Sequence, residues 1–317
     1  MPSLTQLEYA LAVERLRHFG HAAKACHVSQ PTLSQQFQKL EDEVGVMLFD
    51  RLQKPVLPTP EGKRFLEQAK AVVREHQKLL HVSRQERAGE PVGEFRLAVI
   101  PTVASCLVPL FVEEFARKYP KVELSLDEMK TETLLSELRL DRIDGGILAT
   151  PVEGATPSLK IHPLYYEPFD LYAAPHHPIL KKKLLSSDDL EADQLWLLSE
   201  GHCFRNQVLD FCALPRSDHP LLGNIRFQGG SLDTLVRLVD QSKGYTLLPS
   251  LMRKTLGRTG RLRPFRPPVP SREVSFVYRR DHWKLDVIAA LENTIRACLP
   301  KEVNVERPKN FQVLEVC

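Results

Sequence analysis

Two cysteines nine positions apart, in the segment GHCFRNQVLDFC, are the residues of this sequence best placed to carry out chemistry. If the segment is helical, the Cα atoms of Cys203 and Cys212 are separated by about 13 Å along the helix axis, because each residue rises roughly 1.5 Å. A disulfide requires Cα atoms within about 7 Å of each other. Joining the two sulfurs would therefore require the backbone between them to refold, so the pair is either an accident of composition or a chemical switch.

The first cysteine of the pair has the surroundings of a reactive thiol. Cys203 follows an apolar run that ends in SEG and precedes a helix-like run, so its sulfur is expected near a helix N-terminus. That position, with His202 and Arg205 nearby, favours the thiolate over the thiol. Peroxide oxidises a thiolate to a sulfenic acid, which a second thiol converts to a disulfide. Closing a loop of about ten residues is worth roughly 3 kcal/mol, as much as a typical allosteric coupling.

The six cysteines as a set indicate neither a disulfide framework nor a metal site. They are too widely spread for the framework of a small secreted protein, at positions 26, 106, 203, 212, 298 and 317. The sequence has no CxxC, GxGxxG, P-loop or HExxH motif, so it predicts no metal and no cofactor. We expect the thiols outside the pair to be unreactive and to pack as small apolar side chains.

The composition is that of an ordinary globular protein. At 317 residues and 43% hydrophobic, the chain is long enough for two or more domains. It has no apolar run near the roughly 18 residues of a membrane span, and it begins MPSLTQLEYA, without the regions of a signal peptide. These features predict a cytoplasmic protein that does not enter a membrane. The net charge of +3 does not by itself indicate nucleic acid as a partner.

The segment HFGHAAKACHVSQPTLSQQFQKLEDEVG has the pattern of two short helices joined by a tight turn. The first lies near residues 21–26 and is rich in alanine, which lets another helix approach closely. Ser29 is suited to cap the second helix, and Pro31 is tolerated in its first turn. The apolar residues of the second helix form one stripe, at Leu33, Phe37, Leu40 and Val44.

The opposite face of this second helix carries Thr32, Gln35, Gln38 and Lys39. Short and amide side chains can meet base edges in a major groove, and a lysine suits phosphate. A plain solvated helix face has the same composition, so this pattern alone leaves both interpretations open. The next segment, LFDRLQKPVLPTPEG, favours DNA binding because it predicts a hairpin-like wing from which Arg51 and Lys54 can reach the DNA backbone.

A long helix is expected to follow the wing. Thr59 is suited to cap it with Pro60 at its first position, and it is expected to run from about residue 61 to residue 87. Its apolar positions recur with a period close to 3.5, which is typical of a helix that pairs with its copy. These positions are Phe65, Ala69, Val72, Val73, His76, Leu79 and Leu80. Such pairing would place two reading helices about one turn of DNA apart, or multiples of it.

Strands and helices alternate through the rest of the chain, after a Gly/Pro/Glu hinge at residues 88–93. The expected strands are EFRLAVI, VELSLDE, GGILAT, FDLYAAP, QLWLLSE, NIRFQ, YTLLPS and EVSFVYRR. Helical patterns such as ASCLVPLFVEEFARKY, TLLSELRLDRI and SLDTLVRLVDQSKG separate them. This alternation predicts two small α/β lobes with parallel sheets and crossover helices. The last strand and the helix WKLDVIAALENTIRACL are expected to return to the first lobe.

The first sixty-odd residues, from LEYALAV through SQPTLSQQ to LPTPEG, closely resemble the winged helix-turn-helix of the LysR-type transcriptional regulators. The resemblance implies an α/β protein with a winged helix-turn-helix at 1–60, a linker and dimerisation helix at 61–90, and a two-lobed, periplasmic-binding-protein-like regulatory domain at 91–317. Lobe I would comprise about 91–166 and 268–300, and lobe II about 167–267. The residues expected at or near DNA are Ser29, Gln30, Pro31, Thr32, Gln35 and Lys39, with Arg51 in the wing.

The segment GHCFRNQVLDFC further resembles the redox segment of the peroxide-sensing members of this family, as do IPTV, KTETLLSEL, SLDTL, TLLP and VYR elsewhere. This implies Cys203 as the peroxidatic thiol and Cys212 as the resolving thiol. The implied polar pocket for hydrogen peroxide comprises Thr102, Thr131, His202, Arg205 and Arg279. Asn206 occupies a position where an aspartate is expected in better-known members, and the absence of that negative charge bears on the reactivity of Cys203 and on the stability of the reduced fold.

We therefore expect a peroxide-sensing transcriptional regulator, an activator of antioxidant genes, and not an enzyme. The resemblance implies promoter DNA, RNA polymerase and hydrogen peroxide as partners, a homodimer formed through the linker helix, and a homotetramer. One alternative is a regulator of the same family that recognises a small metabolite in the interlobe cleft and whose thiols are structural. Another is a thiol peroxidase on a DNA-binding scaffold, which would turn over many times and would not need the helix at residues 30–44.

Overall fold

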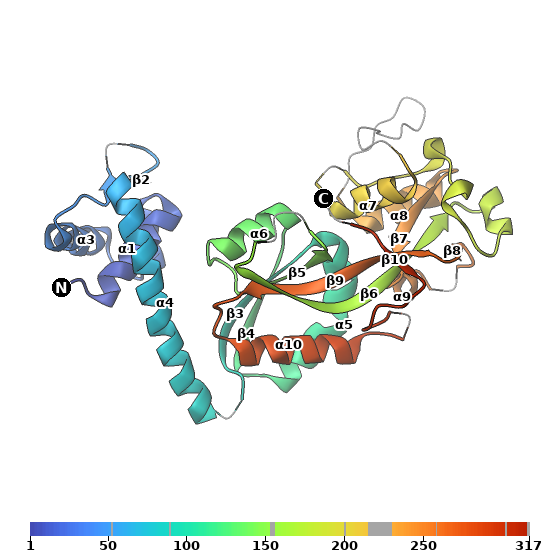
Figure 1. Ribbon diagram of the computed structural model, residues 1–317. Coiled ribbons are helices and arrows are strands. Elements are labelled where there is room, and N and C mark those ends of the chain that lie inside the picture. The colour runs from blue at the N-terminus through green and yellow to red at the C-terminus, as the bar shows by residue number, and fades with distance from the viewer. Residues whose placement is uncertain are drawn as a thin grey trace. The chain divides into compact units, whose positions relative to one another are not determined.

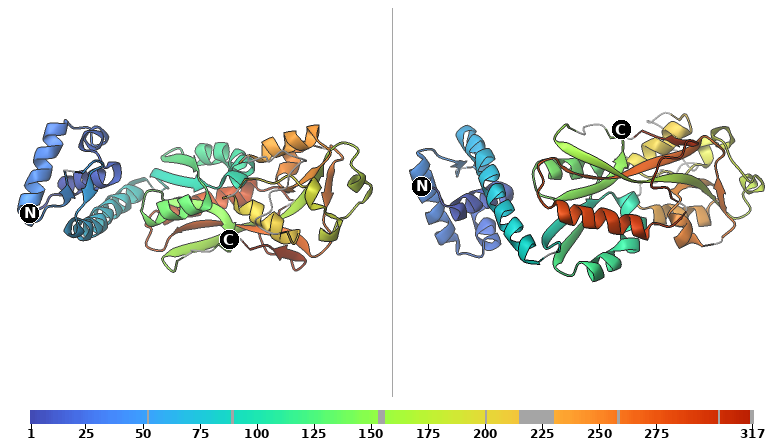
Figure 2. Two further views of the ribbon diagram at one scale, coloured as in Figure 1. Left: turned by 90° about the horizontal axis from the view of Figure 1, so that it is seen from above. Right: turned by 60° about the horizontal axis from the view of Figure 1, so that its bottom comes forward.

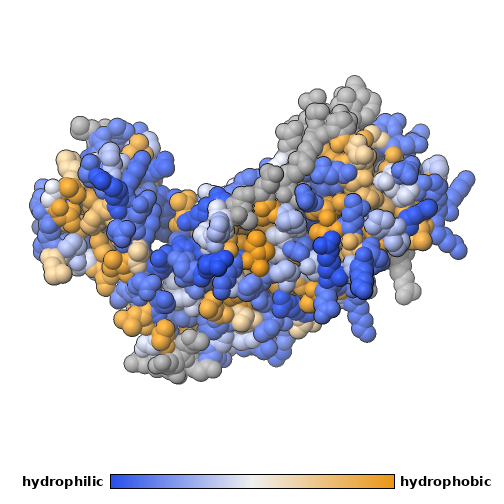
Figure 3. Space-filling model, in the orientation of Figure 1, coloured by the Kyte–Doolittle hydropathy of each residue, from blue (hydrophilic) through white to orange (hydrophobic). Residues whose placement is uncertain are grey.

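The computed structural model describes the chain apart from residues 52, 89, 153–155, 200, 215–229, 258, 302 and 316–317, and apart from the side chains of residues 84–88. The chain forms two compact units, residues 1–89 and residues 90–317 (Figure 1). Within the described residues, no helix is both long and apolar enough to span a membrane. On the face shown in Figure 3, hydrophilic side chains cover much of the surface of each unit, and smaller apolar areas lie among these side chains.

The first unit is a helical domain with a small two-stranded wing. Its elements are α1 (Leu4–Leu16), α2 (Phe19–Ala25), α3 (Gln30–Val44), β1 (Phe49–Asp50), β2 (Leu57–Pro58) and α4 (Pro60–Ala88). α3 begins as the sequence predicts, because the Ser29 hydroxyl accepts a hydrogen bond from Thr32 N at 3.2 Å. Leu33, Phe37 and Leu40 are fully buried in the core of this unit, so the predicted apolar stripe holds α3 in place.

The linker helix α4 starts with the predicted cap, since Thr59 Oγ1 accepts a hydrogen bond from Gly62 N at 2.9 Å. Its apolar positions do not form the single unpaired seam that their spacing predicts. Ala69 and Val73 are buried in the core of the first unit, where they complete the packing of the helical domain. The exposed large apolar residues of α4 are Val72, Leu79, Leu80 and Val82. The exposed large apolar side chains of α4 therefore lie mainly in the C-terminal half of the helix.

The second unit is built on a mixed β-sheet. Its strands are β3 (Gly93–Val99), β4 (Val122–Glu128), β5 (Gly145–Thr150), β6 (Leu159–Ala173), β7 (Tyr245–Pro249), β8 (Leu262–Pro264), β9 (Val269–Arg279) and β10 (Phe311–Val313). The main order is β4-β3-β5-β9-β6-β7, with β8 on β6 and β10 on β9. β3 pairs in parallel with β4 and β5, but β9 runs antiparallel to β5 and β6. The sequence predicts parallel sheets, and the observed sheet is mixed, because β9 returns through the sheet against its neighbours.

Two long strands, β6 and β9, extend through both lobes of this unit (Figure 1). β6 pairs with β9 along residues 159–168 and with β7 along residues 169–173. β3, β4 and β5 complete the sheet of the first lobe, and β7 and β8 lie in the second. The sequence predicts a strand only over the last third of β6, from residue 169, and does not predict the part that pairs with β9.

Helices cover the sheets of both lobes (Figure 2). The helices of the first lobe are α5 (Pro101–Lys118), α6 (Thr131–Arg139) and α10 (Leu285–Cys298), and those of the second are α7 (Cys203–Phe211), α8 (Leu232–Gln241) and α9 (Met252–Leu256). Short 3-10 helices, η1 (Pro178–Lys181), η2 (Ser187–Asp189) and η3 (Ala192–Gln194), also occur in the second lobe. α5 follows β3 and α6 follows β4, so both N-termini lie at the carboxyl edge of the parallel strands, where α/β sheets bind ligands.

One of the expected strands does not form part of the described sheet. The segment QLWLLSE makes only an isolated bridge, between Leu195 and Tyr245. The segment NIRFQ lies outside the described residues. An element that the sequence does not predict, β10, pairs in parallel with residues 269–271 of β9.

Candidate redox site and DNA-reading helix

The two cysteines of the GHCFRNQVLDFC segment lie at opposite ends of one helix. Cys203 is the first residue of α7, and Cys212 is its C-cap. Both are free thiols. Nine residues of helical rise separate their Cα atoms by about 13 Å, almost twice the distance that a disulfide allows. Most of α7 is regular helix with a buried face, so the sulfurs meet only if the helix unwinds.

The sulfur of Cys203 lies against the start of a second helix. Thr131 Oγ1 is 3.0 Å from Cys203 Sγ, and Thr131 is the first residue of α6. The N-termini of α6 and α7 thus meet at this sulfur. The free N–H groups and the dipole of a helix N-terminus favour negative charge, and a hydroxyl can donate to a sulfur anion. Both features favour negative charge at the position of the Cys203 sulfur.

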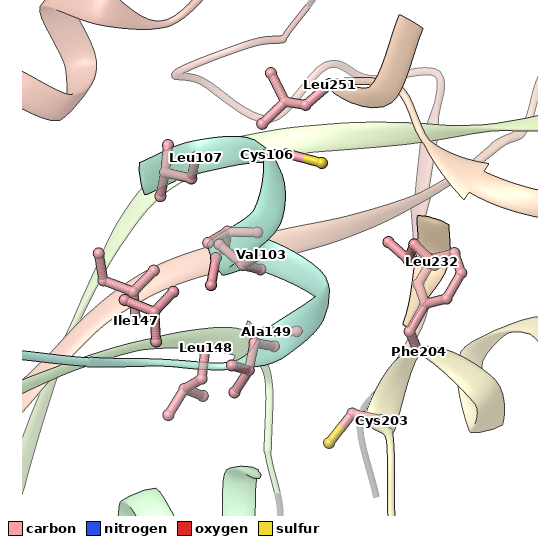
Figure 4. Packing of buried hydrophobic residues seen from close by; sticks show 14 of the residues in the cluster. Val103, Cys106, Leu107, Ile147, Leu148, Ala149, Cys203, Phe204, Leu232 and Leu251 are labelled. Atoms are coloured by element: carbon pink, nitrogen blue, oxygen red, sulfur yellow. The ribbon is translucent and has the colours of Figure 1, made fainter. Parts of the chain in front are cut away.

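The first turn of α7 is buried in the core of the regulatory unit. Cys203 is 6% exposed, and the ring of Phe204 packs edge-on against Phe169 with their centroids 4.9 Å apart. Figure 4 shows that the Cys203 sulfur and the Phe204 ring point in different directions from the start of the helix. The packing of Phe204 fixes the start of α7, and the small exposure of Cys203 admits only a small reactant.

A fully buried ion pair connects this region with the first lobe. Arg272 of β9 pairs with Glu167 of β6 at 2.8 Å, and neither side chain is exposed to solvent. The Arg272 guanidinium donates to Thr102 Oγ1 at 3.2 Å and to Thr102 O at 3.0 Å, and it lies 5.5 Å from the centroid of the Phe204 ring. Burial opposes the charge of Arg272, but Glu167, together with Tyr165 and Cys106, raises the pKa of the guanidinium above its usual value. The pair therefore links β6, β9 and the N-terminus of α5 with the residue that follows Cys203.

The structure does not bring Arg279 to this site. Its guanidinium pairs with Asp141 at 3.0 Å and with Asp281 at 2.9 Å. Seven residues of strand separate Arg279 from Arg272, which is about 23 Å of rise along β9. The place of Arg279 in the peroxide pocket therefore stays a prediction that these contacts do not support, whereas Arg272 is the arginine of β9 that contacts Thr102 and Phe204.

His202, the N-cap of α7, completes the surroundings of the thiol. Burial and then the positive charge of Lys130 lower the pKa of His202, whereas Glu132 acts in the opposite direction. The imidazole is therefore neutral at neutral pH. Gly201 has a φ of +81°, and a Cβ built on it would lie 2.8 Å from Lys130 Nζ. Only glycine fits this turn beside the lysine without strain.

Three other thiols have pKa values above the usual value of a cysteine. Burial raises the pKa of Cys212 to about 12. Burial, with help from Glu167, raises that of Cys106 to about 11. Burial also raises the pKa of Cys26. These groups are protonated at neutral pH and react slowly with peroxide, because the thiolate is the nucleophile.

The remaining residues of the predicted pocket lie around the same helix starts. Thr102 and Arg205 are 3% and 2% exposed, and Asn206 is half-buried in the first turn of α7. Thr102, Thr131, His202, Arg205 and Cys203 thus lie at the N-termini of α5, α6 and α7. In the described ranges no three His, Cys, Asp or Glu side chains come together as a metal ion requires.

The second candidate site is the exposed face of α3. The residues predicted to face DNA are all exposed: Ser29, Gln30, Pro31, Thr32, Gln35 and Lys39. Arg51 differs from them, because it pairs with the buried Glu41 and lies 5.5 Å from the centroids of the Phe19 and Phe37 rings. Glu41 also accepts a hydrogen bond from Leu48 N at 2.7 Å. Arg51 therefore braces the turn that leads into the wing, a role that the sequence does not reveal.

Sequence reasoning missed two residues of the redox region, Glu167 and Arg272. Glu167 lies in the segment YYEPF, which carries no recognisable motif. Arg272 precedes a run of strand residues and looks like a surface residue at a strand start. The one available signal is its position directly before the expected strand that carries Arg279, and nothing in the sequence shows that Arg272 points inward.

The fold and the matched segments identify the class of protein. The family "Bacterial regulatory helix-turn-helix protein, lysR family" matches residues 4–63, and "LysR substrate binding domain" matches residues 88–299. The chain belongs to the LysR family of bacterial regulators.

Its relatives include proteins that are named for hydrogen peroxide. The chain is 37% identical over 280 residues to the "Hydrogen peroxide-inducible genes activator" of Dickeya chrysanthemi, a match that covers 87% of this chain and 89% of that one. It is 37% identical over 282 residues, with the same coverage, to the "DNA-binding transcriptional dual regulator OxyR" of Escherichia coli. A solved structure of a full-length OxyR variant from Pseudomonas aeruginosa superposes with a TM-score of 0.77 at 32% identity, covering 96% of this chain and 99% of that one.

Proposed function

We propose that this chain is a peroxide-responsive, DNA-binding transcriptional regulator, an activator that is switched by a disulfide between Cys203 and Cys212. The names of its relatives support the peroxide response and the regulation of genes. The single observation that carries the proposal is the position of Cys203, whose sulfur lies at the N-terminus of α7 and 3.0 Å from the Thr131 hydroxyl. In this mechanism the two cysteines reduce hydrogen peroxide in two steps.

In the first step, the Cys203 thiolate attacks one oxygen of hydrogen peroxide. A sulfur–oxygen bond forms while the oxygen–oxygen bond breaks, and the departing hydroxide takes a proton to leave as water. Thr131, the helix N-termini and buried Arg272 provide positive potential and hydrogen-bond donors near the charge that moves. Cys203 becomes a sulfenic acid.

In the second step, Cys212 attacks the oxidised sulfur. The sulfur–sulfur bond forms as the sulfur–oxygen bond breaks, and the hydroxyl leaves as water with the proton that Cys212 gives up. The two thiols together supply the two electrons that reduce one peroxide. Burial holds Cys212 as a thiol in the resting fold, since its pKa is about 12, so α7 must open before this cysteine reacts.

Unwinding α7 supplies the signal. The helix carries the buried side chains of Phe204, Val208 and Leu209, and the ring of Phe211 packs against Phe265 at 4.9 Å between centroids. Closing the loop is worth roughly 3 kcal/mol, which is enough to offset the loss of part of this packing. The second lobe then presents a different surface to its neighbours.

Partners follow from the exposed surfaces of the other unit. We propose that α3 reads promoter DNA through Gln35 and its neighbours, and that two chains pair through the exposed apolar residues of α4, among them Leu79 and Leu80. We propose that the altered lobe changes how the chains pack in a tetramer and how they contact RNA polymerase, and that this changes transcription. We also propose the division into residues 1–60, 61–90 and 91–317 as the functional domains.

The proposal is tested with the reduced full-length protein and three variants, Cys203→Ser, Cys212→Ser and the matched control Cys298→Ser. Peroxide is added, the disulfides are mapped by mass spectrometry, and the DNA footprint is compared before and after. We expect a bond between residues 203 and 212 and a changed footprint in the wild type and in Cys298→Ser, and neither in the other two. A footprint that responds to peroxide without Cys203 would refute the mechanism. A response to a metabolite in a chain that lacks both cysteines would favour a metabolite regulator instead.

A further inference from the structure

We propose that Gln207 and the C-terminal segment at residues 303–314 are positioning elements that hold α7 in its helical form and thereby set how readily the Cys203–Cys212 disulfide forms. This inference rests on the proposed function, because it concerns the same helix and the same bond. It adds a group of residues that touch neither peroxide nor the two sulfurs.

The contact between the segment and the helix is direct and buried. Gln207 lies in the middle of α7, four residues after Cys203, and none of its surface is exposed. Its Nε2 donates a hydrogen bond to Leu314 O at 2.9 Å. Leu314 itself is 6% exposed and belongs to the same apolar core as Phe204 and Val208. The C-terminal end of the described chain therefore lies against the helix that must unwind.

The segment is firmly attached to the sheet on its other side. β10 pairs in parallel with residues 269–271 of β9, Leu314 N donates to Ser271 O at 2.9 Å, and Ser271 Oγ donates to Gln312 O at 3.1 Å. Further back, Asn304 and Tyr166 exchange two backbone hydrogen bonds. These anchors are on β6 and β9 and do not involve α7, so the segment can stay in place when the helix changes.

The position of Gln207 makes its hydrogen bond sensitive to the redox state. Bringing the Cα atoms of Cys203 and Cys212 from about 13 Å to within about 7 Å requires the turns between them to unwind. Gln207 is at the centre of that stretch, so its bond to Leu314 is lost in the disulfide form. The bond therefore stabilises only the reduced form and opposes oxidation.

The segment lies beyond the part of the chain that the family description covers, since that match ends at residue 299. The cysteines and the pocket lie inside the match, but the C-terminal anchor does not. Chains that differ here can therefore differ in the threshold of the switch while keeping the same chemistry.

The test measures the equilibrium between the disulfide and two thiols in buffers of reduced and oxidised glutathione, where two glutathione molecules reduce one disulfide. Full-length protein is compared with Gln207→Met, which removes the donor and keeps the side-chain length, and with a chain that ends at Lys309. The matched control is Thr294→Ala, which removes a buried hydrogen bond to Ala290 O at 2.8 Å in α10, away from α7. The rate at which peroxide first oxidises Cys203 is measured in parallel.

We expect both test variants to shift the equilibrium toward the disulfide, by about tenfold for Gln207→Met, which corresponds to about 30 mV for a two-electron couple. The rate of the first oxidation should stay within about twofold, because neither change touches the Cys203 sulfur, and Thr294→Ala should shift neither quantity. An unchanged equilibrium in Gln207→Met and in the shortened chain overturns the inference, as does an equal shift in the control. If the wild type forms no 203–212 bond at all, the proposed function fails together with the inference.

Discussion

The substitution Thr131→Val tests the geometry around the reactive sulfur most sharply. Valine has nearly the shape of threonine but lacks the hydroxyl that lies 3.0 Å from Cys203 Sγ, at a position that is 4% exposed. A hydrogen bond to a charged group is worth about 1.5–3 kcal/mol, and each 1.36 kcal/mol is a factor of ten in an equilibrium. The population of the Cys203 thiolate at neutral pH should therefore fall by about ten- to a hundredfold.

The assay is the rate of the first oxidation by peroxide, followed across pH in a Cys212→Ser background so that the second step does not contribute. The loss of rate should be largest at neutral pH and should vanish at high pH, where the thiolate forms without help. Thr246→Val is the matched control, because its hydroxyl donates to Trp196 O at 2.8 Å in the same unit and is equally buried. An unchanged rate at neutral pH in Thr131→Val refutes the assignment, and a loss that is equal at every pH shows that the hydroxyl positions the sulfur without stabilising its charge.

Three further outcomes follow from the structure. Arg272→Met leaves the fully buried Glu167 without its partner, so the free energy of unfolding in denaturant should fall by about 3–5 kcal/mol. Adding Glu167→Gln should recover much of this loss. A minor loss of stability in the single variant would contradict the buried pair. Burial lowers the pKa of His282 to about 4, so the folded state resists protonation there and stability should be lost as the pH falls from 6.5 toward 4, by up to about 3 kcal/mol. In His282→Gln that slope should flatten, as acid denaturation followed by circular dichroism would show, and an identical slope would exclude His282 as its source. Lys39→Ala should weaken DNA binding at all sequences and reduce the salt dependence of binding by about one unit of slope; titrations at several salt concentrations check this, and an unchanged slope would remove Lys39 from the phosphate contacts.

Local features of the site could be predicted from the sequence because short-range rules govern them. The Ser29 and Thr59 caps, the apolar stripe of α3 and the start of a helix at Cys203 follow from residue types within one or two turns. The contact between Thr131 and Cys203 joins residues 72 positions apart, and it was expected only by resemblance to a family.

Sequence reasoning is weakest where the tertiary fold decides. Arg272 and Arg279 lie on one strand but seven residues apart, so they are far apart along it and point to opposite faces of the sheet. The composition of the strand does not show which face is covered. The spacing of apolar residues in α4 likewise cannot show that Ala69 and Val73 pack within their own domain while Leu79 stays exposed.

Hydrogen exchange of the backbone amides in residues 203–212, before and after peroxide, tests the claim that the disulfide can form only when α7 unwinds. Wild-type protein and Cys212→Ser are compared, since the variant can be oxidised at Cys203 but cannot close the bond. We predict slow exchange in both reduced proteins, fast exchange in the oxidised wild type, and continued slow exchange in oxidised Cys212→Ser. Equal protection of α7 in a wild-type chain that demonstrably holds the 203–212 bond would contradict the account.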